Sequence, residues 1–212
     1  MNMKQELLLA GQEILASGLV AGTWGNLSVR EPERKAFWIT PSGMDYRYLE
    51  EDDLVLIAEQ GRILEGLRKP SSEHRLHRQI YSNRPDVNGI IHTHSAFATA
   101  HAVAGISIPA VVEDLAQIVG GAVETAAYAE PGSQALAKNT LHALGDKSAV
   151  LLANHGLVGV GPTLAEALKV CQVVEKAAQI HIMARMLGQP VVLGAAEVAC
   201  MRDSYLHNYG QR

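Results

Sequence analysis

The octapeptide Asn88-Gly-Ile-Ile-His-Thr-His-Ser95 predicts a short buried strand that ends in two histidines. Ile90 and Ile91 form its apolar run, and His92 and His94 follow. Residues two apart on a strand point to the same face, so both imidazoles should leave the strand end side by side. This geometry suits one metal ion, although an isolated His-x-His is equally consistent with polar residues at a strand end.

A second strand favours the metal interpretation. The apolar run Ala149-Val-Leu-Leu-Ala153 leads directly into Asn154-His155-Gly156. Two buried strands that each deliver histidine, with an acid on a neighbouring helix, would form a three-histidine site with room for one more ligand. That layout is typical of catalytic rather than structural zinc.

The chain before this octapeptide predicts one helix followed by hairpins. Leucine and isoleucine at near-helical spacing predict a helix over residues 4–17, which Gly18 should stop. Short apolar runs separated by turn residues then predict strands at residues 27–30, 36–39, 54–57 and 62–64.

The rest of the chain alternates helices and strands. Ser71 or Ser72 should cap a helix whose first turn holds Glu73, and Thr163 should cap the longest helix. Further helices are predicted at residues 96–103, 114–119, 134–144, 164–187 and 195–206, and further strands at residues 106–112 and 157–161. Together these elements predict an α/β fold of the α+β type, a single domain over residues 1–212 with a central, mostly antiparallel sheet sandwiched by helices.

Composition narrows the functional classes. Charged residues make up 19% of the 212 residues and the formal net charge is −4. There is no basic stripe for nucleic acid and no uncharged apolar run long enough for a membrane span. Cys171 and Cys200 match neither a metal motif nor a disulfide framework, and the polar N-terminus does not read as a signal peptide. We therefore expect a cytoplasmic enzyme that binds neither nucleic acid nor membrane.

Glu73 is the strongest candidate for an acid/base. The helix dipole by itself favours a carboxylate in the first turn of a helix, so this position alone does not require a catalytic role. The preceding Ser71 and Ser72 indicate an anion-binding site beside Glu73, because hydroxyls and free backbone N–H groups at a helix start bind anions. Residues 22–26 and 40–43 form loops of the same small, hydroxyl-bearing character, and neither matches a Walker or dinucleotide motif. Three such loops suggest a phosphate held mainly by neutral donors.

The other histidines are interpreted as structural or solvent-facing, and the Met183 and Met186 pair as core or subunit contact. These histidines are His74, His77, His101, His142, His181 and His207.

Six short motifs are distributed along the chain. They are Gly22-Thr-x-Gly-Asn26, Thr40-Pro-Ser-Gly43, Pro70-Ser-Ser-Glu73, His92-Thr-His94, Asn154-His-Gly156 and Tyr209-Gly210. As a set they resemble the class II aldolase/adducin family, most closely its L-fuculose-1-phosphate aldolase branch. The resemblance implies reversible cleavage of a ketose 1-phosphate into dihydroxyacetone phosphate and a small aldehyde.

The resemblance also implies the site residues. One zinc ion per subunit would be bound by His92, His94 and His155, with Glu73 as resting ligand and catalytic acid/base. Tyr209 would reach the substrate across a subunit interface of a cyclic homotetramer. The implied phosphate pocket consists of Thr23, Gly25, Asn26, Ser42, Gly43, Ser71 and Ser72.

Two departures make L-fuculose itself a doubtful substrate. Asp114, or its neighbour Glu113, stands where fuculose aldolases have a tyrosine, and Pro131 replaces an aromatic residue near the aldehyde end. Dehydration of a sugar phosphate of the methylthioribulose 1-phosphate type remains an open alternative. A 4-epimerase is disfavoured because such enzymes carry Asp where this chain has Glu73. A non-catalytic adducin-like interaction module is disfavoured because the metal-site histidines are all present.

Overall fold

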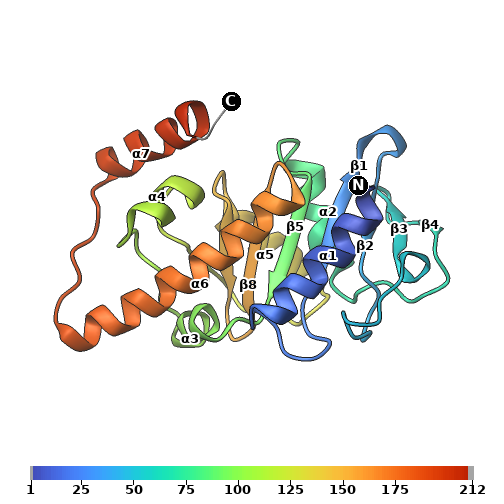
Figure 1. Ribbon diagram of the computed structural model, residues 1–212, viewed down its shortest axis with the longest axis horizontal. Coiled ribbons are helices and arrows are strands. Elements are labelled where there is room, and N and C mark those ends of the chain that lie inside the picture. Colours follow the sequence, from blue (N-terminus) through green and yellow to red (C-terminus); the bar gives the residue numbers. More distant parts are fainter. Residues whose placement is uncertain (1, 210–212) are drawn as a thin grey trace.

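The computed structural model describes residues 2–209, which fold around one eight-stranded sheet (Figure 1). Its strand order is β4-β3-β2-β1-β5-β8-β7-β6. Within this range the neighbouring strands pair antiparallel, except that β6 and β7 run parallel. The strands are β1 (Asn26–Glu31), β2 (Ala36–Ile39), β3 (Val55–Ala58), β4 (Ile63–Glu65), β5 (Gly89–Thr93), β6 (Thr125–Ala126), β7 (Ala149–Leu152) and β8 (Gly156–Gly161). The predicted central, mostly antiparallel sheet is confirmed.

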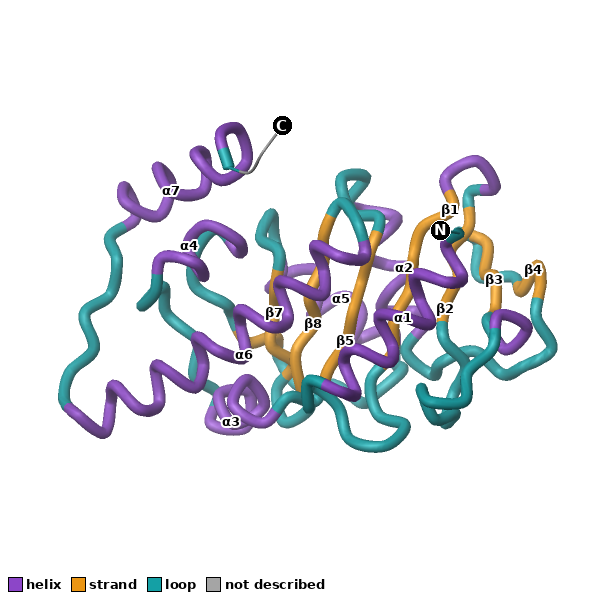
Figure 2. The backbone as a smooth tube through the Cα atoms, viewed as in Figure 1, coloured by secondary structure: helices purple, strands orange, loops and turns teal. Residues whose placement is uncertain are grey.

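Helices cover both faces of this sheet, as predicted. Figure 1 shows α1 and α6 in front of the strands, with α2 and α5 behind them. Figure 2 shows the loop over residues 188–194 running along the left margin from the end of α6 to α7, which packs on α4. The α-helices are α1 (Met3–Ala16), α2 (His74–Asn83), α3 (Ala96–Ala104), α4 (Glu113–Val119), α5 (Gln134–Leu144), α6 (Leu164–Leu187) and α7 (Ala195–Asn208). Among these described elements, none has the length and apolarity needed to cross a membrane.

The central strands are apolar on both faces because each face meets a helical layer. In β2, Trp38 packs into the core beneath α1 and α6, while Phe37 and Ile39 pack into the core beneath α2 and α5. In β7, Leu151 packs into the first of these cores and Leu152 into the second. Strands buried on both faces appear in a sequence as continuous apolar runs rather than as an alternation. That is why these runs could be recognised but not their register.

Three local predictions need correction. The predicted strand at residues 106–112 is irregular, and its only ladder contact in the described chain is the bridge from Ile108 to Val123. Pro109 lacks an N–H group and so interrupts pairing there. Neither Ser71 nor Ser72 caps α2, because Glu73 itself occupies the N-cap position. The sequence also missed β6, which is only two residues long.

The predictions for α6 are confirmed. The helix runs from Leu164 to Leu187, and the Thr163 side chain accepts a hydrogen bond from the backbone N–H of Glu166. Met183 and Met186 near its end are exposed, so they are not part of the core of this chain.

Candidate metal centre

Three histidines converge where β5 and β8 pair. His92 lies on β5, His94 just beyond its end, and His155 in the turn between β7 and β8. The register sets His92 opposite Val158, so the β5 end and this turn come together. The three ring centroids lie 4.7, 4.8 and 4.9 Å apart. Each ring offers a ligand nitrogen within 4.8 Å of the other two, so the trio could hold a metal ion.

Two glycines permit this close approach. A Cβ at Gly156 would lie 2.2 Å from the carbonyl oxygen of Thr93 and 3.2 Å from the ring of His92. Gly25 has a φ of +84°, and a Cβ there would lie 2.6 Å from the carbonyl oxygen of His92. Larger residues at either position would push the backbone away from the histidines.

The hydrogen bonds of His92 determine which nitrogen it offers. Its Nδ1 lies 2.9 Å from the backbone carbonyl oxygen of Leu157. Because a carbonyl only accepts, Nδ1 must carry the proton and donate. The lone pair is then on Nε2, which faces His94 at 2.9 Å and Glu73 at 3.2 Å. A backbone partner on the outer nitrogen is the usual way in which a metal-binding histidine is oriented.

Glu73 supplies the carboxylate of this cluster. Its Oε2 accepts a hydrogen bond of 2.8 Å from Asn26 Nδ2, and its Oε1 lies 3.5 Å from His155 Nε2. The residue is 5% exposed. Burial opposes the charged form, but His92, His155 and the Asn26 bond outweigh it, so the pKa of Glu73 lies below its ordinary value. The carboxylate is therefore ionised at neutral pH.

The donor set fits a divalent metal ion. Oε1 of Glu73 is buried and finds no hydrogen-bond donor among the residues that the structure describes. A buried carboxylate oxygen without a partner is costly unless a cation compensates it. Three imidazoles and one carboxylate match the ligands and number that zinc prefers.

The two outer histidines are held in the form that binds metals. Burial, together with His92 and His155, lowers the pKa of His94 to about 4. Burial and His92 also lower the pKa of His155. Both imidazoles are therefore neutral at pH 7, as metal binding requires.

A cavity of about 360 Å³ adjoins the cluster. Two of its loops are joined by backbone hydrogen bonds, from Ser71 N to Thr40 O at 3.1 Å and from Ser42 N to Lys69 O at 2.9 Å. The structure thus brings together every residue that the sequence had suggested for phosphate. These lining residues are Thr23, Gly25, Asn26, Ser42, Gly43, Ser71 and Ser72.

Two residues of this region were not predicted from the sequence. Trp24 lines the cavity, is 64% exposed, and stacks on His94 with ring centroids 5.6 Å apart. Its place inside the loop of residues 22–26 was the available signal. His77, interpreted as structural, contacts Asn26 through its Nε2 at 2.5 Å. It lies four residues, one helical turn, after Glu73, which is the N-cap of α2.

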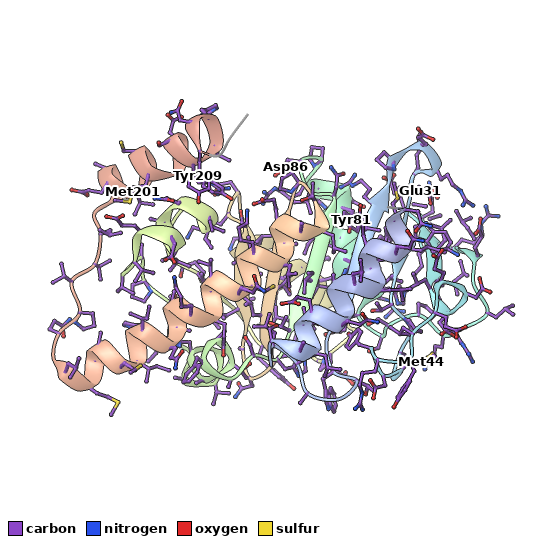
Figure 3. The ribbon with its side chains drawn as sticks, viewed as in Figure 1. Glu31, Met44, Tyr81, Asp86, Met201 and Tyr209 are labelled. Atoms are coloured by element: carbon purple, nitrogen blue, oxygen red, sulfur yellow. The ribbon has the colours of Figure 1, made fainter. Side chains whose placement is uncertain are left out.

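The structure does not bring Tyr209 to the histidines of its own chain. Tyr209 is exposed, contacts the ring of Tyr205 in a tilted arrangement, and lines a separate cavity with Arg202. Figure 3 shows Tyr209 by α7, well away from Tyr81 of α2. The other half of its motif, Gly210, lies outside the described residues.

The residues that differ from those of fuculose aldolases do not all lie at the cavity. Pro131 lines the cavity beside the histidines. Asp114 instead forms an ion pair with Lys176 of α6, and neither it nor Glu113 lines that cavity.

Comparison with known proteins identifies relatives along nearly the whole chain. Residues 5–182 match the model of the Class II Aldolase and Adducin N-terminal domain. The 5-deoxy-D-ribulose 1-phosphate aldolase of Bacillus thuringiensis serovar kurstaki is 35% identical, with 99% of this chain and 97% of that protein covered. The 5-methylthioribulose-1-phosphate/5-deoxyribulose-1-phosphate aldolase of Rhodospirillum rubrum is 37% identical, with 96% and 90% covered. A solved structure of an L-fuculose 1-phosphate aldolase superposes with a TM-score of 0.94 at 38% identity and covers 96% of both chains.

Proposed function

Because the chain belongs to the class II aldolase and adducin family and is an aldolase, we propose that it is a zinc enzyme that cleaves a ketose 1-phosphate reversibly. The products are dihydroxyacetone phosphate and a small aldehyde. The observation that carries this proposal is the meeting of His92, His94 and His155 with Glu73 beside a cavity lined by neutral donors. Aldolase relatives along nearly the whole chain set aside a non-catalytic adducin-like role.

We propose a 5-deoxypentulose 1-phosphate, rather than L-fuculose 1-phosphate, as the substrate. Two relatives with 35% and 37% identity are named for 5-deoxyribulose 1-phosphate. Trp24 and Pro131 add apolar surface to a cavity otherwise rich in hydroxyls and backbone. Such surface suits an aldehyde that ends in a methyl or methylthio group, because apolar contacts favour an apolar end over one that carries a further hydroxyl.

The phosphate end of the substrate would lie against the cavity loops. Ser71 belongs to the segment that leads into α2, and Ser42 to the loop paired with it. Hydroxyls and backbone N–H groups at such a helix start favour an anion. Neutral donors can thereby hold the phosphate without a lysine.

The proposed chemistry divides the proton transfers between two residues. Zinc, held by the three histidines and Glu73, would supply Lewis acidity that polarises the substrate carbonyl. As the C3–C4 bond breaks, its electron pair stays on C3 and the C4 hydroxyl loses its proton, which leaves the aldehyde. Glu73, which is ionised at rest, would take up a proton from solvent and deliver it to C3 to complete dihydroxyacetone phosphate, and it would remove that proton in the reverse direction. Tyr209, from a neighbouring subunit, would relay the C4 hydroxyl proton, accepting it as its own hydroxyl proton passes to solvent.

We further propose a cytoplasmic homotetramer with its sites at subunit interfaces. Tyr209 lines a different cavity from the one beside the histidines of its own chain, which supports this arrangement. Apolar side chains near the end of α6 and in the following loop are exposed and available for subunit contact. They are Met183, Met186, Leu187 and Val191.

Product analysis tests the reaction. The zinc-loaded protein would be incubated with the 1-phosphates of 5-deoxyribulose, methylthioribulose and fuculose. Dihydroxyacetone phosphate with acetaldehyde or methylthioacetaldehyde would support the proposal. Loss of water without carbon–carbon cleavage would indicate the dehydratase alternative, and a preference for fuculose 1-phosphate would contradict the proposed substrate.

A further inference from the structure

A continuous chain of buried hydrogen bonds reaches Glu73 from the interior of the protein. It begins at Tyr81 Oη, 2.8 Å from Ser28 Oγ, and continues to His77 Nδ1 at 2.6 Å. The other ring nitrogen, His77 Nε2, lies 2.5 Å from Asn26 Oδ1, and Asn26 Nδ2 donates to Glu73 Oε2 at 2.8 Å. All five residues are buried, so water does not compete for these bonds.

The chain joins one strand to one helix. Asn26 and Ser28 are two apart on β1 and share a face, and His77 and Tyr81 are four apart on α2 and do the same. The four side chains therefore interdigitate, with His77 between the two residues of β1. His77 is the member that makes a hydrogen bond through both ring nitrogens.

The polarity of the chain follows from its acceptor end. Asn26 Nδ2 donates to the Glu73 carboxylate, so Asn26 presents its amide NH₂ to Glu73 and its carbonyl oxygen to His77. That oxygen accepts a proton from His77 Nε2, which leaves Nδ1 to accept from Ser28. A neutral His77 is consistent with its complete burial, which lowers the pKa of His77 to about 3.

We propose that His77 is a positioning residue that fixes the orientation of the Asn26 amide and, through it, the carboxylate of Glu73. This inference rests on the proposed metal site, of which Glu73 is one ligand. Without the Nε2–H donor, the Asn26 amide is free to turn its oxygen toward the carboxylate, and the two would repel. With the donor present, Oε2 is occupied by Asn26 and Oε1 remains turned toward His155.

A matched pair of variants tests this role. In His77→Gln the side-chain NH₂ falls near the position of Nε2 and can still donate to Asn26. In His77→Asn the side chain is one carbon shorter and reaches only toward Ser28. Removing an outer partner of a metal ligand typically weakens metal affinity or activity about 10–100-fold. We expect that loss in His77→Asn and its rescue in His77→Gln.

Cobalt provides a readout independent of turnover. Each protein would be titrated with Co²⁺ against a chelator, and its visible absorption recorded. His77→Asn should bind Co²⁺ more weakly, with a changed spectrum, and should lower kcat with little change in KM. Tyr81→Phe is the control, because it removes the hydroxyl contacts with Ser28 and Asn88 but leaves the donor to Asn26, so the wild-type spectrum should persist. Equal Co²⁺ affinity and spectrum in His77→Asn and wild type, or an equal disturbance in Tyr81→Phe, would overturn the inference.

The tautomer of His77 can be measured in the unmodified protein, should His77→Asn not fold. Nitrogen-15 NMR of the imidazoles should show a protonated Nε2 and a bare Nδ1, and the opposite tautomer would contradict the proposal. A wild-type protein that binds no divalent metal would instead refute the proposed function, which keeps the two failures distinct.

Discussion

Trp24 is an exposed aromatic side chain in a cavity that otherwise presents mostly hydroxyls, glycines and imidazoles. Its ring lies against His94 at an interplanar angle of 29°. One ring face is therefore supported by a residue of the histidine cluster. This position makes Trp24 the residue through which aldehyde preference can be examined most directly.

We expect Trp24→Ala to lower the selectivity for an apolar aldehyde. In the synthetic direction, with dihydroxyacetone phosphate, kcat/KM for acetaldehyde should fall about tenfold, since small apolar contacts contribute about 1–3 kcal/mol to discrimination. The value for glycolaldehyde should fall less. Trp24→Phe keeps an apolar ring and should retain most of the preference. Equal losses for both aldehydes in Trp24→Ala would show that Trp24 only supports His94.

At the scale of secondary structure, α3 begins immediately after the histidine pair. Its N-cap, Ser95, makes no side-chain capping bond. Glu175 of α6 caps the helix instead, with its two carboxylate oxygens each 2.9 Å from a backbone N–H, of Phe97 and of Ala98. This contact ties the turn that carries His94 to the longest helix of the protein.

Glu175→Gln should therefore weaken both the helix start and metal binding. An amide presents one oxygen and one NH₂ to two donors, and loss of the cap should cost about 1 kcal/mol. We expect the melting temperature to fall by about 2–4 °C and Zn²⁺ affinity to fall up to about tenfold. Calorimetry and chelator competition measure these effects. Glu197→Gln, in the exposed first turn of α7, is the control, and an equal change there would remove the special role of Glu175.

The buried contact of His77 on α2 with Asn26 and Ser28 on β1 should make the metal-free protein sensitive to acid. Burial lowers the pKa of His77 to about 3, whereas an unfolded histidine has a pKa of about 6.5. Between these values the unfolded state binds more protons than the folded state, so stability falls as pH falls. Through this group alone the free energy of unfolding should decrease by at most about 1.4 kcal/mol per pH unit.

Urea unfolding between pH 7.5 and 5 measures this dependence. His77→Gln lacks the titrating ring and keeps the donor to Asn26, so its stability should decline less steeply over the same range. Parallel pH dependences for the two proteins would show that other groups dominate the acid sensitivity.

In the whole molecule, Tyr209 and the histidine cluster of the same chain lie in separate regions. The histidine cluster and the cavity belong to the sheet and its loops, while Tyr209 follows α7 at the margin (Figures 1 and 3). Tyr209 is 66% exposed, and its ring centroid lies 5.2 Å from that of Tyr205. Within one chain this exposure is consistent with a residue that serves a neighbouring subunit.

Complementation between inactive variants should reveal a shared site. Glu73→Gln and Tyr209→Phe, each alone, should have strongly reduced activity, and Tyr209→Phe should keep the wild-type melting temperature. If each site takes Glu73 from one subunit and Tyr209 from another, each residue is intact in about half of the sites of randomly mixed assemblies. Both residues are then intact in about one quarter of the sites. Co-expressed variants should therefore regain activity, which an assay of purified hybrids would measure. No recovery in confirmed hybrids would place Tyr209 outside a shared site.

Local features of the sequence were enough for much of this fold. The spacing of His92 and His94, the cap at Thr163 and the extent of α6 all depend on neighbours within one or two turns of the chain. The metal-site residues and the phosphate loops could also be named, because each lies in a short motif. Their roles as ligands and phosphate donors remain predictions, although the structure places them around one cavity.

Only the tertiary structure decided features that depend on contacts between distant segments. His77 and His101 both lie on helices, yet only His77 faces Asn26, because α2 packs on the face of β1 that carries Asn26 and Ser28. Asp114 pairs with Lys176, and α3 takes its cap from Glu175, in each case across more than 60 residues. The amino-acid sequence by itself determined which segments could form strands, helices and site loops, since those preferences act locally. Folding determined which side chains of those segments meet, since that depends on how the helices pack against the sheet.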